Sequence, residues 1–140
     1  MATYNKFNLV TQNLASGVIN TATDTFKIAM CVAASAPVAT NAVLADLTVI
    51  AMTNVTGQTL TSVTSTQSPA GTEVFNAADT TILASGGAIA TFRYVVLYDD
   101  TPTSPADPLI AWFDYGSDLA LADTESLVIT WNASGIFTIV

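Results

Sequence analysis

Apolar and polar residues alternate along most of this chain, and the alternation predicts short β-strands. Over residues 25–32 the apolar Phe26, Ile28, Met30 and Val32 occupy every second position, which is typical of a strand with one buried face. The strongest strand is expected over 88–98, whose centre reads FRYVVLY. Similar reasoning predicts strands over 47–52, 58–67, 73–76, 81–83, 109–115, 125–131 and 136–140, with the last two joined as a hairpin through 132–135.

One segment near the start departs from the strand period. Phe7, Val10, Leu14 and Val18 recur at intervals of three and four residues, which predicts a short helix over 5–16 that ends at Gly17. Residues 1–20 are therefore expected to form an N-terminal arm that carries this helix. A helical turn is also expected over 40–46.

The order of these elements indicates the fold class. About eight short strands lie between turn signals, and no sustained helices alternate with them. We expect a mainly β, single-domain antiparallel β-sandwich of the jelly-roll type, with a barrel as the alternative. The 140 residues suit one domain over 1–140, because domains typically hold about 100 to 150 residues.

Composition adds that the surface carries few charges. Charged residues make up 10% of the chain and hydrophobic residues 51%, whereas soluble domains average about 25% charged residues. Three basic residues stand against eleven acids, for a net charge of −8. Binding to nucleic acid or to an anionic membrane surface needs clustered Lys and Arg, so neither is expected. The sequence has no secretory signal and no apolar run of about 20 residues, so we expect a cytosolic product.

Candidate chemistry is scarce. Histidine is absent, which removes the side chain most used for acid–base catalysis near neutral pH and the commonest transition-metal ligand. Cys31 is the only cysteine, and its apolar neighbours predict a buried, inert thiol. No phosphate-binding loop, nucleophile elbow or metal-ligand spacing occurs. We therefore expect a protein that is not an enzyme and needs no cofactor.

The acids are densest in one stretch, at Asp99, Asp100, Asp107, Asp114 and Asp118. Calcium prefers several oxygen ligands, so this stretch is a candidate calcium loop. The spacing matches no known calcium motif, however, and Asp beside Pro and Thr is typical of solvated turns. Two of these carboxylates could also be read as a glycosidase pair, but no acid is singled out for such a role.

Aromatic residues gather nearby. Trp112, Phe113 and Tyr115 lie close together, and Tyr94 and Tyr98 fall on one face of their predicted strand. Core packing is the common use of such residues in small β proteins. A contact with a sugar ring or a protein partner is the alternative.

Several stretches resemble small virion proteins of tailed bacteriophages. These stretches are 5–7 (NKF), 24–30 (DTFKIAM), 36–47 (APVATNAVLADL), 92–102 (FRYVVLYDDTP) and 107–116 (DPLIAWFDYG). The resemblance covers most of the chain, and residues 50–71 depart from it most. It implies a non-enzymatic structural protein, of which capsid cement, or decoration, is the best understood role for a short β-rich chain.

The resemblance implies partners as well. A cement protein would bind the major capsid protein on the outer surface of the head, and the net charge fits that side because packaged DNA would repel an acidic protein. We expect a homo-oligomer, with a dimer favoured over a trimer because two-fold assemblies are commonest. Phe7, Leu14 and Trp112 are the predicted interface residues. A tail or fibre component that binds a receptor or carbohydrate near 99–108 and Trp112 is the alternative.

Overall fold

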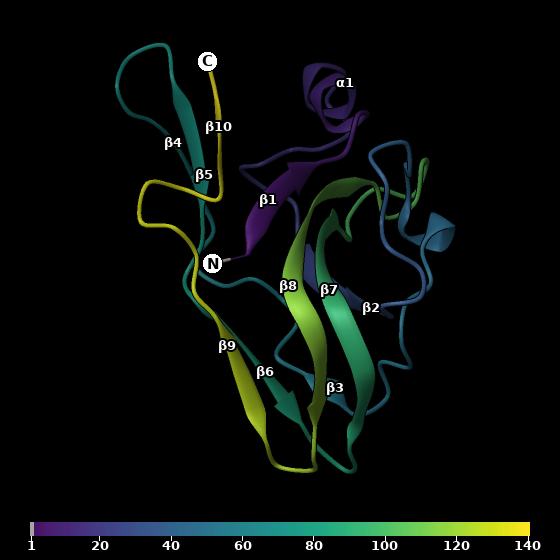
Figure 1. The fold of residues 1–140 in the computed structure, drawn as a ribbon. Coiled ribbons are helices and arrows are strands. Elements are labelled where there is room, and N and C mark those ends of the chain that lie inside the picture. Colours follow the sequence, from purple (N-terminus) through teal and green to yellow (C-terminus); the bar gives the residue numbers. More distant parts are fainter. Residues whose placement is uncertain (1) are drawn as a thin grey trace.

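The computed structural model describes residues 2–140 and confirms a mainly β chain with antiparallel sheets and a short helix (Figure 1). The helical elements are α1 (Val10–Ala15) and a single 3-10 turn, η1 (Leu44–Asp46). The strands are β1 (Thr3–Lys6), β2 (Phe26–Cys31), β3 (Val55–Thr56), β4 (Thr64–Gln67), β5 (Glu73–Asn76), β6 (Thr80–Ala84), β7 (Ile89–Asp99), β8 (Leu109–Leu121), β9 (Ser126–Ile129) and β10 (Phe137–Ile139).

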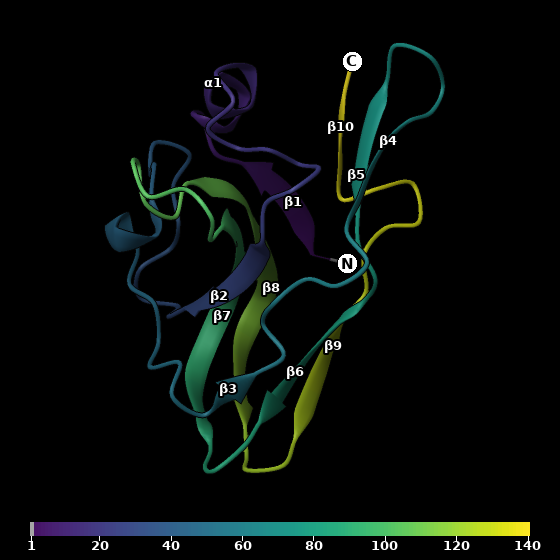
Figure 2. The same cartoon turned by 180° about the vertical axis from the view of Figure 1, so that it is seen from behind.

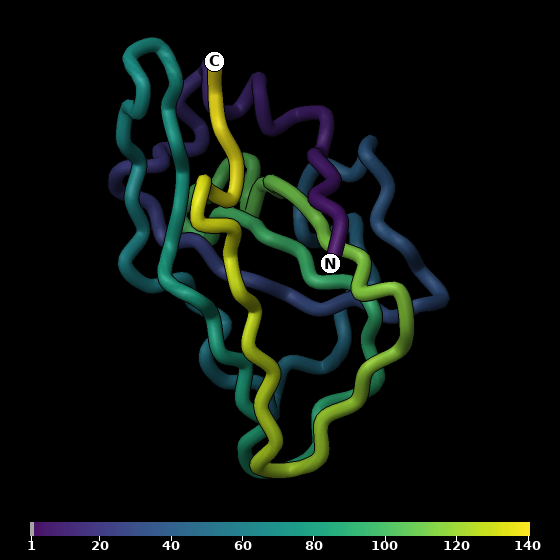
Figure 3. Tube along the Cα trace, turned by 60° about the vertical axis from the view of Figure 1, so that its left-hand side comes forward, coloured from purple at the N-terminus to yellow at the C-terminus, as the bar shows by residue number. Residues whose placement is uncertain are grey.

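Within residues 2–140 the strands form three antiparallel sheets. The largest has the order β1-β8-β7-β2, and the two smaller ones have the orders β10-β5-β4 and β3-β6-β9. In both ribbon views the smaller sheets follow one another along one side of the four-stranded sheet (Figure 1, Figure 2). The chain turns from β8 into β9 at the end of the molecule opposite the C-terminus (Figure 3). The antiparallel pairing is therefore established, and these sheets are the frame for any site.

The core lies on both faces of the four-stranded sheet. Alternation along β2 sends Ile28 and Met30 into the larger apolar cluster, while Ala29 and Cys31 join a smaller cluster on the other face. The larger cluster ties the sheets together through Phe75 on β5, whose ring lies 4.9 Å from that of Phe26 on β2. The predicted one-sided strand is therefore buried on both faces.

The N-terminal prediction is right about a helix and wrong about where it begins. Residues 3–6 pair with β8 as a strand, so the helix starts only at Val10. Its end follows the prediction, since Gly17 has a φ of +73° and its N–H donates to the carbonyl of Leu14 at 3.3 Å. The N–H of Val18 donates to Asn13 at 2.9 Å, which completes a Schellman cap.

The predicted C-terminal hairpin is wrong. β9 pairs with β6, and β10 pairs with β5, so the two strands joined by 132–135 belong to different sheets. Strand β8 also runs beyond the predicted limit of residue 115, through Gly116 to Leu121. The positive φ of Gly116, +93°, lets the ladder with β7 continue across an irregularity.

The other predicted strands are found in part. β5 has the predicted limits and β7 is one residue off at each end, whereas β4 is only the last part of the predicted strand over 58–67. The predicted strand over 47–52 is reduced to an isolated bridge between Val49 and Cys31. β7 ends at Asp99 and β8 begins at Leu109, and the loop that joins them contains Pro102, Pro105 and Pro108.

Candidate interaction site

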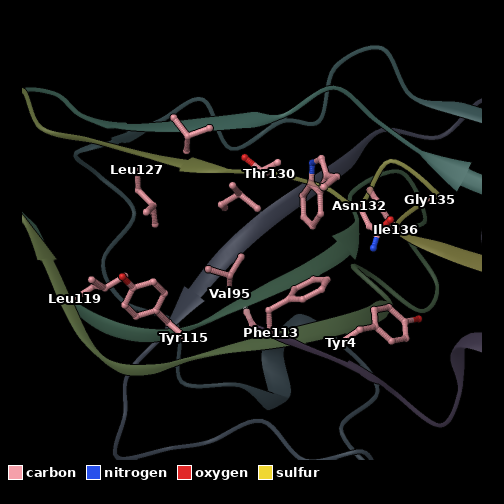
Figure 4. A pocket seen from close by; sticks show the side chains of 14 residues that line it. Tyr4, Val95, Phe113, Tyr115, Leu119, Leu127, Thr130, Asn132, Gly135 and Ile136 are labelled. Atoms are coloured by element: carbon pink, nitrogen blue, oxygen red, sulfur yellow. The ribbon is translucent and has the colours of Figure 1, made fainter.

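An open apolar groove lies between β8 and β9. Figure 4 shows side chains from the two strands pointing into it from opposite sides, with Leu127 on β9 and Phe113 and Tyr115 on β8. Its volume is about 500 Å³. It is lined by Ala2, Tyr4, Val95, Phe113, Tyr115, Leu119, Leu127, Val128, Ile129, Thr130, Trp131, Asn132, Gly135 and Ile136.

Among residues 2–140, no charged side chain lines this β8–β9 groove, although the whole chain carries fourteen. Tyr115 and Val128 remain 55% and 54% exposed, so apolar surface is left in contact with solvent. Exposed apolar patches on soluble proteins commonly mark a place where another molecule binds. The groove can therefore bury an apolar partner without removing water from a charge.

Aromatic residues pack together to form one wall of the groove. The ring of Phe113 lies 5.9 Å from Tyr4 on β1 and 5.6 Å from Trp131, which follows β9. The indole Nε1 of Trp131 donates to the Thr80 hydroxyl at 3.1 Å, so its one polar atom is satisfied inside the core. This wall joins β1, β8 and β9 into one surface.

A second groove, of about 840 Å³, lies between β1 with α1 on one side and β10 on the other. It shares Tyr4, Asn132, Gly135 and Ile136 with the β8–β9 groove, so the two grooves are adjacent. Within the described part of the chain, Lys6 is the one charged side chain that lines this β1–β10 groove, and its Nζ donates to the Thr11 hydroxyl at 3.0 Å.

The three predicted interface residues are not brought together. Leu14 lines the β1–β10 groove and is partly buried against the larger core cluster. Phe7 is fully buried, and its ring lies 4.6 Å from that of Trp112 in the smaller cluster. Trp112 and Phe113 are neighbours on a strand and so point to opposite faces of the sheet. Phe7 therefore acts in the isolated chain as a core residue.

Sequence reasoning missed the residues that define the β8–β9 groove. The sequence places Tyr4 in an N-terminal arm and Tyr115 beside Trp112, whereas in the structure Trp112 faces the other side of the sheet. The available signal was Val128, because alternation with Leu127 and Ile129 in the predicted strand over 125–131 leaves this valine on the outward face. An outward valine on a sheet face is a reason to look for an exposed apolar patch.

The acidic stretch contains ion pairs. Asp114 receives two hydrogen bonds from the Arg93 guanidinium, at 2.8 and 2.9 Å, and these lower the pKa of its carboxyl, with a smaller contribution from the N–H of Gly116. Asp100 lies 2.6 Å from Lys27. Within residues 2–140 no three Asp, Glu or Cys side chains gather as metal ligands would, so the calcium loop gains no support.

Asp99, by contrast, is completely buried. Its Oδ1 accepts a hydrogen bond from the N–H of Thr101 at 3.0 Å, while Oδ2 has no donor among the described residues. Burial, followed by its interactions with Asp24 and Asp100, raises its pKa to about 7. Below that pH the carboxyl is mostly protonated, and its side-chain hydrogen bond with Asp24 requires such a proton because two carboxylates cannot donate to each other.

Cys31 lies in the smaller core cluster. Its side chain is fully buried, and burial raises the pKa of the thiol to about 11. The thiolate, which is the reactive form, is therefore scarce at neutral pH. This agrees with the inert thiol expected from its apolar neighbours.

Over residues 2–140, no helix is both long and apolar enough to cross a bilayer.

Comparison with known proteins gives no relative from which to transfer a function. Searches for matching protein families, for similar characterised proteins and for similar solved structures found no match to this chain.

Proposed function

We propose that this chain is a non-enzymatic structural protein of a tailed-phage virion, a cement protein that binds the outer surface of the head and bridges adjacent major capsid subunits. The observation that carries the proposal is the β8–β9 groove, an apolar surface to which no charged side chain of residues 2–140 contributes, on a chain of net charge −8. Such a surface suits contact with another protein more than catalysis.

The charge distribution supports binding to the outer surface of the head. The acids lie outside the groove, so the remaining surface is negative and would be repelled by DNA inside the head. Many copies bound to one shell would together make it resist internal pressure, even if each copy binds weakly. The jelly-roll arrangement and a homo-oligomer, a dimer before a trimer, stay predictions that accompany this proposal.

A tail or fibre component that binds a receptor or carbohydrate is the second candidate. The exposed Tyr115 and the nearby Tyr4 favour it, because aromatic faces stack on sugar rings. The two candidates differ in stoichiometry. A cement protein is present in hundreds of copies on each head, whereas tail components are present in few.

Copy number in purified virions of the encoding phage separates these candidates. Quantitative mass spectrometry against the major capsid protein is expected to give hundreds of copies per particle. A few copies, or binding of the isolated protein to host cells, would instead favour the tail component.

Reconstitution tests the groove itself. Heads that lack the protein are incubated with the purified chain, and occupancy is measured across a concentration series. Val128→Asp puts a charge into the β8–β9 groove and is expected to raise the half-saturating concentration about tenfold or more, because an unpaired carboxylate would have to be desolvated. Val38→Asp is the matched control, since Val38 is 52% exposed and lies outside both grooves. Equal occupancy by both variants would contradict the role of the groove.

A further inference from the structure

One edge of the four-stranded sheet is unpaired and lies beside both grooves. β1 is the first strand in the order β1-β8-β7-β2, and among residues 2–140 it has a partner only on the β8 side. An unpaired edge presents backbone N–H and C=O groups that can pair with another extended chain. The register decides which residues present them.

The backbone hydrogen bond of Phe7 shows which residues of β1 bond to β8. Its N–H donates to the carbonyl of Ile110 at 3.2 Å, in line with the register in which Asn5 faces Trp112. In an antiparallel pair the bonded residues alternate, so the odd-numbered residues of β1 bond to β8. Tyr4 and Lys6 therefore direct their N–H and C=O groups away from β8, toward the free edge.

The same two residues line the grooves. Tyr4 lines both the β8–β9 and the β1–β10 groove, and Lys6 lines the β1–β10 groove. Across that groove lies β10, from Phe137 to Ile139, which pairs only with β5 among the strands of residues 2–140 and so leaves a second free edge. A chain lying along β1 would thus find backbone partners at the edge and apolar side chains beside it.

Lys6 adds a charge requirement. Among residues 2–140, it is the only basic side chain with no carboxylate within 4.0 Å, because Lys27 pairs with Asp100 and Arg93 with Asp114. A lysine on an edge strand ordinarily discourages pairing with another chain. A partner chain with a carboxylate beside Lys6 would avoid the cost of covering an unpaired charge. Chains without such a carboxylate would still incur that cost.

We propose that β1 receives an extended, apolar segment of the capsid partner as an additional strand, with a carboxylate of that segment paired to Lys6. The inference rests on the proposed function and names the partner's chemistry at this surface. A second copy of β1 fits less well, because the strand reads TYNK and offers no carboxylate to pair with Lys6.

The test uses the same heads and concentration series. Lys6→Glu reverses the charge and is expected to raise the half-saturating concentration about tenfold or more, and Lys6→Gln by less. Tyr4→Pro removes the outward N–H and leaves the bonds of Thr3 and Asn5 to β8; it is expected to bind up to about tenfold more weakly than Tyr4→Ala, which lacks only the ring. Each variant is first checked for a wild-type melting temperature, and Lys6→Glu suffices if Tyr4→Pro does not fold.

The outcomes separate the two proposals. Wild-type protein that does not bind heads would overturn the proposed function, and the strand addition with it. Wild-type protein that binds while Lys6→Glu and Tyr4→Pro bind equally well would overturn the strand addition alone. The strand addition would also fail if Lys6→Glu changed only the oligomeric state of the free protein and not its occupancy on heads.

Discussion

At the residue scale, the buried Asp99 makes the free energy of unfolding depend on pH. Its pKa of about 7 lies far above the ordinary value for aspartate, chiefly because burial disfavours the charged form. Between about pH 4 and 7 the unfolded chain gives up this proton while the folded chain keeps it. The folded state then binds more protons than the unfolded state, so stability falls as the pH rises through this window and levels off above it.

Asp99→Asn is expected to remove that dependence. The amide is uncharged, its oxygen can still accept from Thr101, and its nitrogen can donate to Asp24. Relative to wild type, the variant should gain about 1–3 kcal/mol in free energy of unfolding between pH 4 and pH 8. Urea denaturation at a series of pH values measures this. Asp118→Asn, at an exposed position, is the control, and a parallel pH profile for wild type and Asp99→Asn would contradict the assignment.

At the element scale, the alternation of residues predicted the features that depend on neighbouring residues alone. The strands β2, β5 and β7 and the glycine end of α1 follow from alternation and capping, and all were placed within about two residues. The partners of β9 and β10 were missed because a polar, glycine-containing connection of four residues is typical of a hairpin, whereas pairing is decided by contacts distant in the sequence. The grooves were missed for the same reason, since they form between strands whose pairing the sequence does not specify.

Gly57 allows the backbone after β3 to lie close to β6. It follows β3 with a φ of +81°, and a Cβ at this position would collide with the carbonyl oxygen of Thr81 on β6. Gly57→Ala should therefore combine backbone strain of about 1–2 kcal/mol with a steric cost of about 1–3 kcal/mol. Gly116→Ala is the control, because Gly116 has a φ of +93° but open space around it. Thermal unfolding should show the larger loss for Gly57→Ala, and equal losses would contradict the close approach of the two strands.

At the scale of the whole molecule, the sheets share one core although they share no strand. The larger cluster contains residues from every sheet, among them Ile28, Phe75 and Ile82. Phe75 is the link between two of the sheets, since its ring lies 4.9 Å from Phe26 and 4.8 Å from Phe137. Because each small sheet buries its apolar face only against this common core, we expect the chain to unfold as one cooperative unit.

The two tryptophans allow that cooperativity to be measured. Trp112 lies in the four-stranded sheet and Trp131 beside the sheet of β9, so Trp131→Phe and Trp112→Phe leave one fluorescent probe in each region. Phe75→Ala is expected to cost about 3–5 kcal/mol and to shift both probes by the same amount, although Phe75 contacts neither tryptophan ring among the aromatic pairs of residues 2–140. A shift confined to Trp131 would mean that the smaller sheets unfold separately. The groove between β8 and β9 would then open without loss of the four-stranded sheet, and its shape would not be fixed by the common core.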